Sequence, residues 1–300
     1  MIDTQFAFDR YESLRGVLPK AKFPKASQTG SSLKDTAEHF DAYILDAFGV
    51  LNRGETAIEG AVVRMSELRA AGKRLIVLTN AASYTRDEIL TKYHRLGFDF
   101  TADEVVSSRD IAFANLPTLK DDQAWAAISA AGDDFSDAPD KARLEDLISN
   151  PSLFRTAGGF ILLSTARWGV EETLDLGKAL KANPRPLVIA NPDLVAPREG
   201  GLTIEPGMIA HDIVPQKGVR AEFYGKPYDN AFDTALAKLA NIPRDRVAMV
   251  GDTLHTDVLG GAAAGVRTIL ITDHGLFRGC DVTPFIENSG IRPDWIVETT

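Results

Sequence analysis

Short hydrophobic runs alternate with longer amphipathic stretches along most of this chain. The runs at residues 43–45, 73–78 and 246–250 end next to polar residues or glycine. Hydrophobic runs of this kind predict buried strands, whereas the amphipathic stretches at 58–71 and 86–96 predict helices. Strands that alternate with such helices are typical of parallel βαβ units. The pattern therefore predicts an α/β fold whose core is a doubly wound, Rossmann-like parallel sheet.

The middle of the chain carries strands and a helix of its own. Hydrophobic runs at 125–128, 159–163 and 187–190 predict strands, and residues 170–181 predict a helix. These elements suffice for a second α/β unit, inserted into the first. A chain of 300 residues also exceeds what one hydrophobic core usually serves. The expected division is an N-terminal extension that packs on the core (1–40), a first part of the core (41–105), an inserted α/β cap (106–206) and a second part of the core (207–300).

The N-terminal extension combines an amphipathic stretch with a polar connector. Residues 5–18 place hydrophobic side chains among charged ones, which predicts a short helix that ends at Pro19. Residues 20–32 are basic and contain Pro, Ser and Gly, which predicts a connector. We expect this extension to pack as an appendage on the main domain.

The composition argues against several kinds of partner. With 44% hydrophobic and 25% charged residues, the chain has ample material for a core. Its net charge of -9 argues against nucleic acid or an anionic membrane as the main partner. The single Cys280 excludes an internal disulfide framework and suits a reducing compartment. No hydrophobic run is long enough to span a bilayer and the first residues do not resemble a signal peptide, so we expect a cytoplasmic protein.

Polar side chains follow the ends of several predicted strands. Parallel strands present their carboxyl ends at one edge of a sheet, so we expect residues far apart in the sequence to converge there. Asp252 and Asp257 lie five positions apart across a strand-to-helix turn, a spacing that can place both carboxylates around one Mg²⁺ ion. Lys226 would add a positive charge, and Thr79 a hydroxyl group ahead of a helix N-terminus, for binding phosphate oxygens. The candidate sites are Asp46 with Gly49 after it, Thr79-Asn80, Gly225-Lys226-Pro227 and residues 251–257.

These motifs together resemble those of the haloacid dehalogenase superfamily, in its class IIA branch with a C2-type cap. Asp46 matches the nucleophile of motif I, Leu78-Thr79-Asn80 matches motif II and Gly225-Lys226-Pro227 matches motif III. The sequence Gly-Asp-Thr-Leu-His-Thr-Asp at 251–257 matches motif IV, is characteristic of this branch and is the most specific piece. The resemblance covers about residues 40–297. Further pieces that resemble class IIA are Asn191-Pro192-Asp193 and Pro206-Gly207.

The resemblance implies a phosphatase-like hydrolase. Asp46 would attack phosphorus and form an aspartyl-phosphate, which water then hydrolyses. Lys226, Thr79 and Asn80 would bind the transferring phosphoryl group and stabilise its charge. The substrate implied is a small phosphorylated metabolite such as a sugar phosphate, because a cap over the core restricts entry. Relatives in this branch often pair through their caps, which implies a homodimer.

The resemblance also implies a bound Mg²⁺ ion. Its ligands would be Asp46, the backbone carbonyl of Phe48 and Asp252, and Asp257 would contribute directly or through water. The ion would bridge the nucleophile and the phosphoryl oxygens while it offsets their repulsion.

Phe48 departs from the superfamily pattern. Phosphatases of the superfamily usually carry a second Asp two positions after the nucleophile, and this Asp is the general acid for the leaving group. Phe48 cannot transfer a proton, and general acid–base assistance is typically worth about a hundred- to ten-thousandfold in rate. The chain is then either a slow phosphatase that favours good leaving groups or one in which another residue donates the proton. His255 is one candidate for that role, although a histidine at this variable position is expected to be an exposed turn residue.

Two other functions stay open at this point. Superfamily dehalogenases also carry an aromatic residue two positions after the nucleophile, but the acidic motif IV argues against their metal-independent chemistry. The other alternative is a binding module that keeps the metal and phosphate site without efficient turnover. The sequence does not select among the cap residues that are candidates for substrate contact, which are Arg109, Arg167, Trp168 and Arg198.

Overall fold

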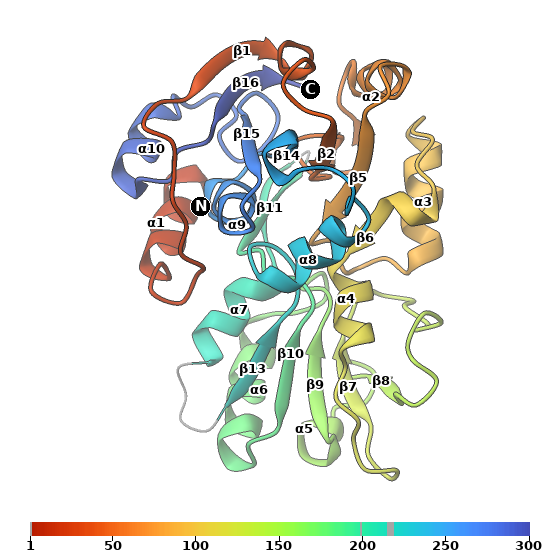
Figure 1. The fold of residues 1–300 in the computed structure, drawn as a ribbon. Coiled ribbons are helices and arrows are strands. Elements are labelled where there is room, and N and C mark those ends of the chain that lie inside the picture. Colours follow the sequence, from red (N-terminus) through yellow and green to blue (C-terminus); the bar gives the residue numbers. More distant parts are fainter. Residues whose placement is uncertain (1, 199, 215–218) are drawn as a thin grey trace.

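The computed structural model describes residues 2–198, 200–214 and 219–300, and these form two α/β units, one above the other in Figure 1. The larger sheet of the described residues has the strand order β1-β16-β15-β14-β2-β5-β6, and all its neighbouring strands run parallel. The predicted parallel α/β core is confirmed. Its strands are β1 (Gln28–Ser32), β2 (Ala42–Leu45), β5 (Arg74–Thr79), β6 (Val105–Ser107), β14 (Val247–Gly251), β15 (Arg267–Ile271) and β16 (Trp295–Thr299).

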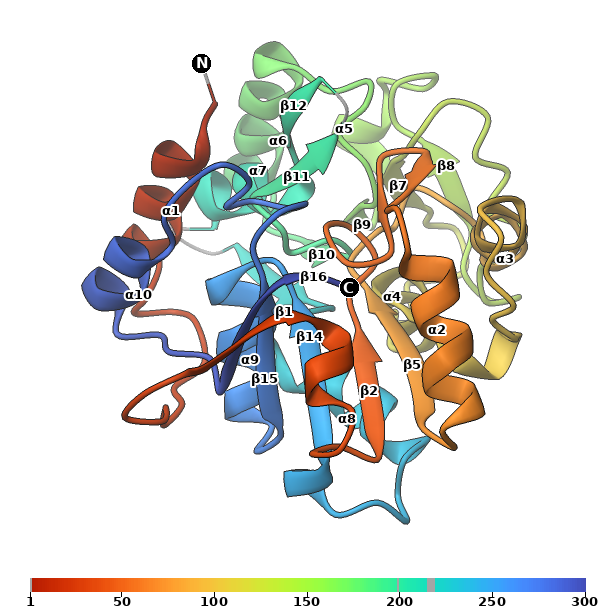
Figure 2. The ribbon, with the colours of Figure 1, turned by 90° about the horizontal axis from the view of Figure 1, so that it is seen from above.

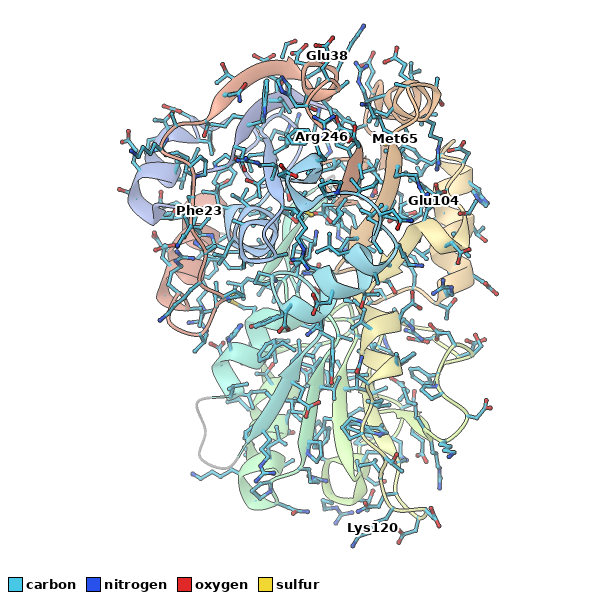
Figure 3. All side chains as sticks on the ribbon, in the orientation of Figure 1. Phe23, Glu38, Met65, Glu104, Lys120 and Arg246 are labelled. Carbon is cyan, nitrogen blue, oxygen red and sulfur yellow. The ribbon has the colours of Figure 1, made fainter. Side chains whose placement is uncertain are left out.

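Helices cover both faces of the larger sheet, because successive residues of each strand point to opposite sides. Tyr43 of β2 is buried in one cluster with Met65 of α2, which Figure 3 labels, and with Tyr93 of α3. Ile44 of the same strand is buried on the other face with Ile111 of α4 and Phe232 of α8. The sheet is thus doubly wound, as predicted. These helices are α2 (Ala61–Ala70), α3 (Arg86–Arg95), α4 (Ser108–Ala114) and α8 (Asp229–Ala237).

The smaller sheet is that of the inserted cap, and it is also parallel, with the order β13-β10-β9-β7-β8. Helices α5, α6 and α7 contribute to the hydrophobic cluster on one of its faces. The other face packs against Phe113 of α4, and Lys120 lies at the far end of the cap in Figure 3. The elements are β7 (Trp125–Ile128), β8 (Leu144–Asp146), β9 (Gly159–Leu162), β10 (Pro186–Ile189), β13 (Arg220–Phe223), α5 (Leu153–Thr156), α6 (Val170–Ala182) and α7 (Pro206–Ile213).

Two antiparallel hairpins were not predicted from the sequence. One directly follows β2 and the other joins β10 to α7. Their strands are short and partly exposed, so they carry no continuous hydrophobic run. A π-helical turn at Leu254–Val258 leads directly into helix α9. The remaining elements are β3 (Asn52–Arg53), β4 (Thr56–Ala57), β11 (Val195–Arg198), β12 (Gly201–Ile204), α9 (Leu259–Ala263), α10 (Thr283–Ser289) and the 3₁₀ turns Leu33–Thr36, Ala102–Glu104 and Arg244–Arg246.

Helix α1 (Thr4–Ser13) packs on the core through its buried residues Phe8 and Tyr11. The Asp3 side chain caps the helix by accepting a hydrogen bond from the Phe6 N–H at 2.8 Å. In Figures 1 and 2 α1 lies beside α10, and the ring centroids of Phe8 and Phe285 are 5.0 Å apart. The predicted helix therefore exists, but it ends at Ser13 rather than at residue 18. Among the described residues no helix combines the length and the apolar character needed to cross a membrane.

The observed strand pairing departs from the sequence-based expectations in two places. The connector predicted at 20–32 contains β1, which pairs with β16 at the edge of the larger sheet. β1 is held through its backbone and is mostly exposed, so it gives no hydrophobic signal. The cap was expected to end at 206, but α7 packs in the cap cluster and β13 pairs with β10 up to Phe223. Pro206-Gly207 does not mark a return to the core, because Pro206 is the first residue of α7.

Candidate active site

The carboxyl ends of β2, β5 and β14 meet at one edge of the larger sheet. Asp46 follows β2, Thr79 is the last residue of β5 and Asp252 follows β14. These strands are neighbours, because β2 pairs with both β5 and β14. Lys226 reaches the same place from the loop between β13 and α8. The structure thus brings together residues that lie far apart in the sequence.

Lys226 connects two carboxylates in the interior. Its Nζ lies 2.6 Å from Asp46 Oδ1 and 2.7 Å from Asp257 Oδ1, and the side chain is only 1% exposed. Burial by itself would favour the neutral amine, but Asp257 and Asp46 hold the pKa of Lys226 above its usual value. The ammonium group therefore remains charged at the edge where Asp46 ends its strand.

Asp46, Asp252 and Asp257 form a compact carboxylate cluster, with one oxygen of each within 4.8 Å of the others. Burial raises the pKa of Asp46 to about 7, against the opposing effect of Lys226, and Asp257 adds to the rise. Burial, Asp257 and Asp46 raise the pKa of Asp252 to about 8. One ammonium group does not neutralise three carboxylates, whereas a divalent cation with oxygen ligands would relieve their repulsion. The donor set therefore fits Mg²⁺.

Close backbone approaches hold Asp252 in place. Gly49 has φ +77°, and a Cβ atom there would lie 2.7 Å from Asp252 Cβ. A Cβ atom at Gly275 would lie 1.9 Å from Asp252 Oδ2. The Leu276 N–H donates to this same oxygen at 2.7 Å, and the Thr253 hydroxyl donates to Oδ1 at 2.9 Å. The turn after Asp46 and the loop after β15 therefore both depend on glycine to enclose this carboxylate.

Asn80 links the site to the segment between β10 and β11. Its Nδ2 donates to Asp193 Oδ1 at 2.8 Å and to the Lys226 carbonyl at 2.9 Å, and its Oδ1 accepts from the Lys226 N–H at 2.7 Å. Thr79 was expected just ahead of a helix N-terminus, but α3 begins at Arg86 and is capped by Thr85. The Thr79 hydroxyl instead accepts from the Ala81 N–H at 3.1 Å, because residues 80–84 form an irregular segment.

Phe48 lies against two cations. Arg198 of β11 lies with its Cζ 4.9 Å from the centroid of the Phe48 ring, and Lys92 of α3 lies with its Nζ 5.2 Å from it. Both are within the range of cation–π attraction. Lys92 is also paired with Glu55 at 2.7 Å, and Tyr84 donates to the same carboxylate at 2.8 Å. Position 48 therefore carries an apolar side chain with the positive charges of Arg198 and Lys92 next to it.

A cavity of about 890 Å³ opens between the core, the cap and the β11–β12 hairpin. Phe48 and Tyr84 line it from the core, Trp168 from the cap, and Arg198 from the hairpin. Asp193 also lines it, and this carboxyl group is half-buried. The cavity therefore continues from the position of Phe48 toward the cap. Its size is in the range of small-molecule sites.

Two family models match this chain. Residues 43–136 match a family described as haloacid dehalogenase-like hydrolase, and residues 223–299 match one described as HAD-hydrolase-like. The two matches include Asp46 and Thr79 on one side and Lys226, Asp252 and Asp257 on the other. The chain belongs to the haloacid dehalogenase superfamily. The resemblance stated from the motifs is confirmed.

Relatives of this superfamily member cover nearly its whole length. An acid sugar phosphatase of Staphylococcus aureus (strain USA300) is 24% identical over 259 residues, which are 86% of this chain and 94% of the relative. The structure of a possible sugar phosphatase from Cytophaga hutchinsonii is 28% identical, with a TM-score of 0.79, and the match covers 91% of this chain and 98% of that one. A glycerol phosphate phosphatase from Mycobacterium tuberculosis, solved in complex with magnesium, is 23% identical with a TM-score of 0.65, covering 88% and 76%.

The environment of His255 differs from the one expected from the sequence. It was expected in an exposed turn, but it is buried at 1% exposed and its ring stacks on Tyr11 with centroids 4.9 Å apart. Its Nε2 is 2.6 Å from Glu12 Oε1. Burial also lowers the pKa of His255, against the opposing effect of Glu12. Enclosed by α1 in this way, His255 is not available to donate a proton to a substrate.

The four cap candidates divide into two groups. Trp168 and Arg198 line the cavity. Arg109 is fully buried and pairs with Asp133 and Asp137, each at 2.7 Å, so its role is structural. Arg167 donates to Asp146 Oδ1 at 2.6 Å and to the carbonyl of Ser129 at 3.0 Å, which fixes it within the cap.

Sequence reasoning missed three contributors to the site. Asp193 was noted only as part of a motif, although it is hydrogen-bonded to Asn80 from 113 positions away. Lys92 gave no signal beyond its place in an amphipathic stretch, yet its side chain is 6% exposed and contacts Phe48. Tyr11 accepts a hydrogen bond from the Leu194 N–H at 3.1 Å. Only Asp193 had a usable signal, which was its place next to the proline of Asn191-Pro192-Asp193.

Proposed function

We propose that this chain is a Mg²⁺-dependent phosphatase of class IIA that hydrolyses small phosphate esters through an aspartyl-phosphate on Asp46. The observation that carries the proposal is the position of the Asp46 carboxylate, 2.6 Å from the buried Lys226 ammonium and grouped with Asp252 and Asp257. A carboxylate next to a cation and a carboxylate cluster suits attack on phosphorus, since phosphoryl transfer depends on positioning and charge stabilisation.

Mg²⁺ would be held by Asp46, Asp252 and the backbone carbonyl of Phe48, with Asp257 directly or through water. When bound, the ion supplies Lewis-acid stabilisation of the phosphoryl oxygens and offsets their repulsion from the nucleophile. The raised pKa values of Asp46 and Asp252 support this assignment, because they reflect a charge deficit that a cation would remove. The M. tuberculosis relative was solved in complex with magnesium, which is consistent with the same metal here.

Each of the site residues then has its own role in the reaction. Asp46 attacks the phosphorus atom while the alcohol leaves, and water later releases phosphate from Asp46. Lys226 stays charged and stabilises the negative charge on the transferring oxygens. Thr79 and Asn80 line the end of β5 next to Asp46, where their polar groups orient the phosphoryl group. Asn80 also fixes the backbone of Lys226, so it positions the cation as well.

The leaving group would lie in the cavity between core and cap. A volume of about 890 Å³ accommodates a metabolite larger than phosphate itself, and Phe48, Trp168 and Arg198 offer apolar and positively charged surface. The names of the relatives, which include sugar, glycerol phosphate and p-nitrophenyl phosphatases, support small phosphorylated metabolites as the substrate class. A homodimer formed through the caps and a cytoplasmic location belong to the same proposal, and light scattering and cell fractionation test them.

Phe48 favours one second candidate function. Without a proton donor two positions after Asp46, the chain could bind metal and phosphate ester and turn them over too slowly to serve as an enzyme. It would then act as a binding module. The dehalogenase alternative is weaker, because the buried cluster of Asp46, Asp252 and Asp257 has no purpose in a metal-independent reaction.

The test is phosphate release from p-nitrophenyl phosphate and from glycerol phosphate, with Mg²⁺ and with a chelator. We expect Mg²⁺-dependent turnover that is abolished in Asp46→Asn and unchanged in Asp175→Asn, which alters an exposed carboxylate on α6. Binding of Mg²⁺ without turnover of either ester would support the binding module. Halide release from 2-haloacids that survives the chelator would support a dehalogenase and contradict the proposal.

A further inference from the structure

We propose that Asp193 donates the proton to the leaving group, in place of the aspartate that Phe48 replaces. This inference rests on the proposed phosphatase function. It assigns the missing step to a carboxyl group outside the four motifs, on the segment between the cap sheet and the β11–β12 hairpin.

Asp193 lies at the right place in the molecule. It lines the same cavity as Phe48, and this cavity is where the leaving group would lie. One N–H of the Asn80 side-chain amide bonds Asp193 Oδ1 and the other groups of that amide bond the backbone of Lys226, whose Nζ contacts Asp46. Two residues, Asn80 and Lys226, therefore connect Asp193 to the nucleophile Asp46 through hydrogen bonds.

The backbone around Asp193 is held on every side. Its N–H donates to Asn191 Oδ1 at 3.0 Å, its carbonyl accepts from the Gly207 N–H at 3.0 Å, and the next N–H, that of Leu194, donates to the Tyr11 hydroxyl at 3.1 Å. A Cβ atom at Gly207 would lie 2.6 Å from the Asp193 carbonyl oxygen, so the two segments are in close contact. A proton donor needs such fixed placement, because its reach is that of one hydrogen bond.

The chemistry of the group is suitable for the step. Among the residues that the structure describes, Asn80 is the side chain that donates a hydrogen bond to the Asp193 carboxyl group, and it donates to Oδ1. Oδ2 would then carry the proton, and the Asp193 side chain lines the cavity into which it would be delivered. Burial raises the pKa of Asp193 well above its usual value, against the opposing effect of Lys226 and with Asp46 adding to the rise, which favours the protonated form that a general acid needs.

The step balances as follows. Asp46 forms a bond to phosphorus as the bond from phosphorus to the ester oxygen breaks, and the proton of Asp193 goes to that oxygen, which leaves as an alcohol. Asp193 is then a carboxylate. In the second half, it takes a proton from water while the water oxygen attacks phosphorus, and the bond to Asp46 breaks. Phosphate leaves, and both carboxyl groups return to their starting states.

The test compares two leaving groups in Asp193→Asn. Asn retains an oxygen that accepts from Asn80, so the fold is kept while the proton is lost. We expect kcat/KM for glycerol phosphate, which reports the steps up to departure of the alcohol, to fall by about a hundredfold or more, as general acid catalysis is typically worth this much. The kcat/KM for p-nitrophenyl phosphate, whose leaving group needs no proton, should stay within about threefold, although its kcat can fall through the second half-reaction that both esters share. Asp175→Asn, which alters an exposed carboxylate on α6 outside the cavity, should leave kcat/KM for both esters unchanged.

Equal losses for the two esters, or no loss for either, would overturn the assignment of Asp193. Wild-type protein offers a second measurement that depends on no variant. Across a series of aryl and alkyl phosphates, a proton donor makes log kcat/KM depend weakly on the pKa of the leaving alcohol, and a steep dependence would overturn the inference. If the wild-type protein hydrolyses no ester and Asp46→Asn behaves in the same way, the proposed function itself is overturned rather than the role of Asp193.

Discussion

The guanidinium group of Arg198 lies over the ring of Phe48, with Cζ 4.9 Å from the ring centroid. Lys92 approaches the same ring from α3, with Nζ at 5.2 Å. A carboxyl group at this position would therefore have two cations close to it, and opposite charges within such distances favour the ionised form. The aromatic residue and the two cations fit one another, so residue 48 cannot be restored to an efficient general acid by a single substitution.

Phe48→Asp is accordingly expected to raise glycerol phosphate turnover by no more than about tenfold, below the usual effect of a general acid. The reason is that Arg198 and Lys92 would keep the new carboxyl group ionised. In the double variant Phe48→Asp/Arg198→Met the gain should be larger than in Phe48→Asp alone. Steady-state kinetics of the two variants and of Arg198→Met give the comparison. A full gain in the single variant would contradict the role assigned to the cations.

Lys226→Met should reduce both activity and stability. Removal of one member of a buried ion pair leaves uncompensated charge and typically costs about 3–5 kcal/mol. Removal of one charge-stabilising donor typically costs about a hundred- to a thousandfold in kcat. We expect both effects, measured by chemical denaturation and by release of phosphate. Lys178→Met is the control, because Lys178 pairs with Asp175 on the exposed side of α6 and should change neither quantity. Normal turnover in Lys226→Met would contradict its proposed role.

Much of the core could be predicted from the sequence because its central strands are buried on both faces. The residues of β2, Ala42–Leu45, are all buried, as are five of the six residues of β5, so each forms a continuous hydrophobic run. Strand ends in such a sheet share one edge, which is why the positions of Asp46 and Asp252 could be predicted as well. β1 escaped prediction because its edge position requires only backbone hydrogen bonds, and its side chains are polar.

The surroundings of the site could not be predicted, because they depend on contacts between distant segments. The ring of Phe48 meets Arg198 from the hairpin, and Asn80 meets Asp193 across 113 positions. His255 was expected to be exposed, since the sequence of motif IV does not reveal that α1 covers it. The proton-donor problem raised by Phe48 was visible in the sequence, whereas the half-buried carboxyl group near it depends on the fold.

Stability should fall with rising pH when no divalent cation is present. The folded protein raises the pKa of Asp46 to about 7 and of Asp252 to about 8, whereas an unfolded aspartate has a pKa of about 3.9. Between about pH 4 and pH 8 the folded state therefore binds more protons than the unfolded state, and the free energy of unfolding decreases as pH rises. Below about pH 4 both states are protonated, so the free energy of unfolding no longer changes with pH through these two groups.

Mg²⁺ should reverse this trend, since it binds ionised carboxylates. We expect its addition to raise the melting temperature more at about pH 8 than at about pH 5, because fewer protons compete at the higher pH. Asp252→Asn should remove most of the increase at both values, and Asp212→Asn, an exposed carboxylate, should retain it. Differential scanning fluorimetry with Mg²⁺ and with a chelator gives the result. An equal increase at both pH values in the wild-type protein would argue against the cluster as the binding site.

The hydroxyl group of Tyr11 connects the N-terminal helix to the active site. It accepts from the Leu194 N–H at 3.1 Å, directly beside Asp193, while the Tyr11 ring stacks on His255 of motif IV. Tyr11→Phe would leave a buried N–H without its partner, which costs about 1–3 kcal/mol. It would also release the backbone that fixes the Asp193 carboxyl group in the cavity.

Tyr11→Phe should therefore lower the stability and, in addition, lower kcat for glycerol phosphate more than for p-nitrophenyl phosphate. Tyr43→Phe is the matched control. It removes another buried hydroxyl group, whose partner is Thr36 at 3.1 Å and which lies away from the cavity. Its stability should fall by a similar amount while the ratio of the two kcat values stays at that of the wild type. If both variants lose stability and neither changes this ratio, the extension serves only to hold the fold, and the coupling between α1 and Asp193 is wrong.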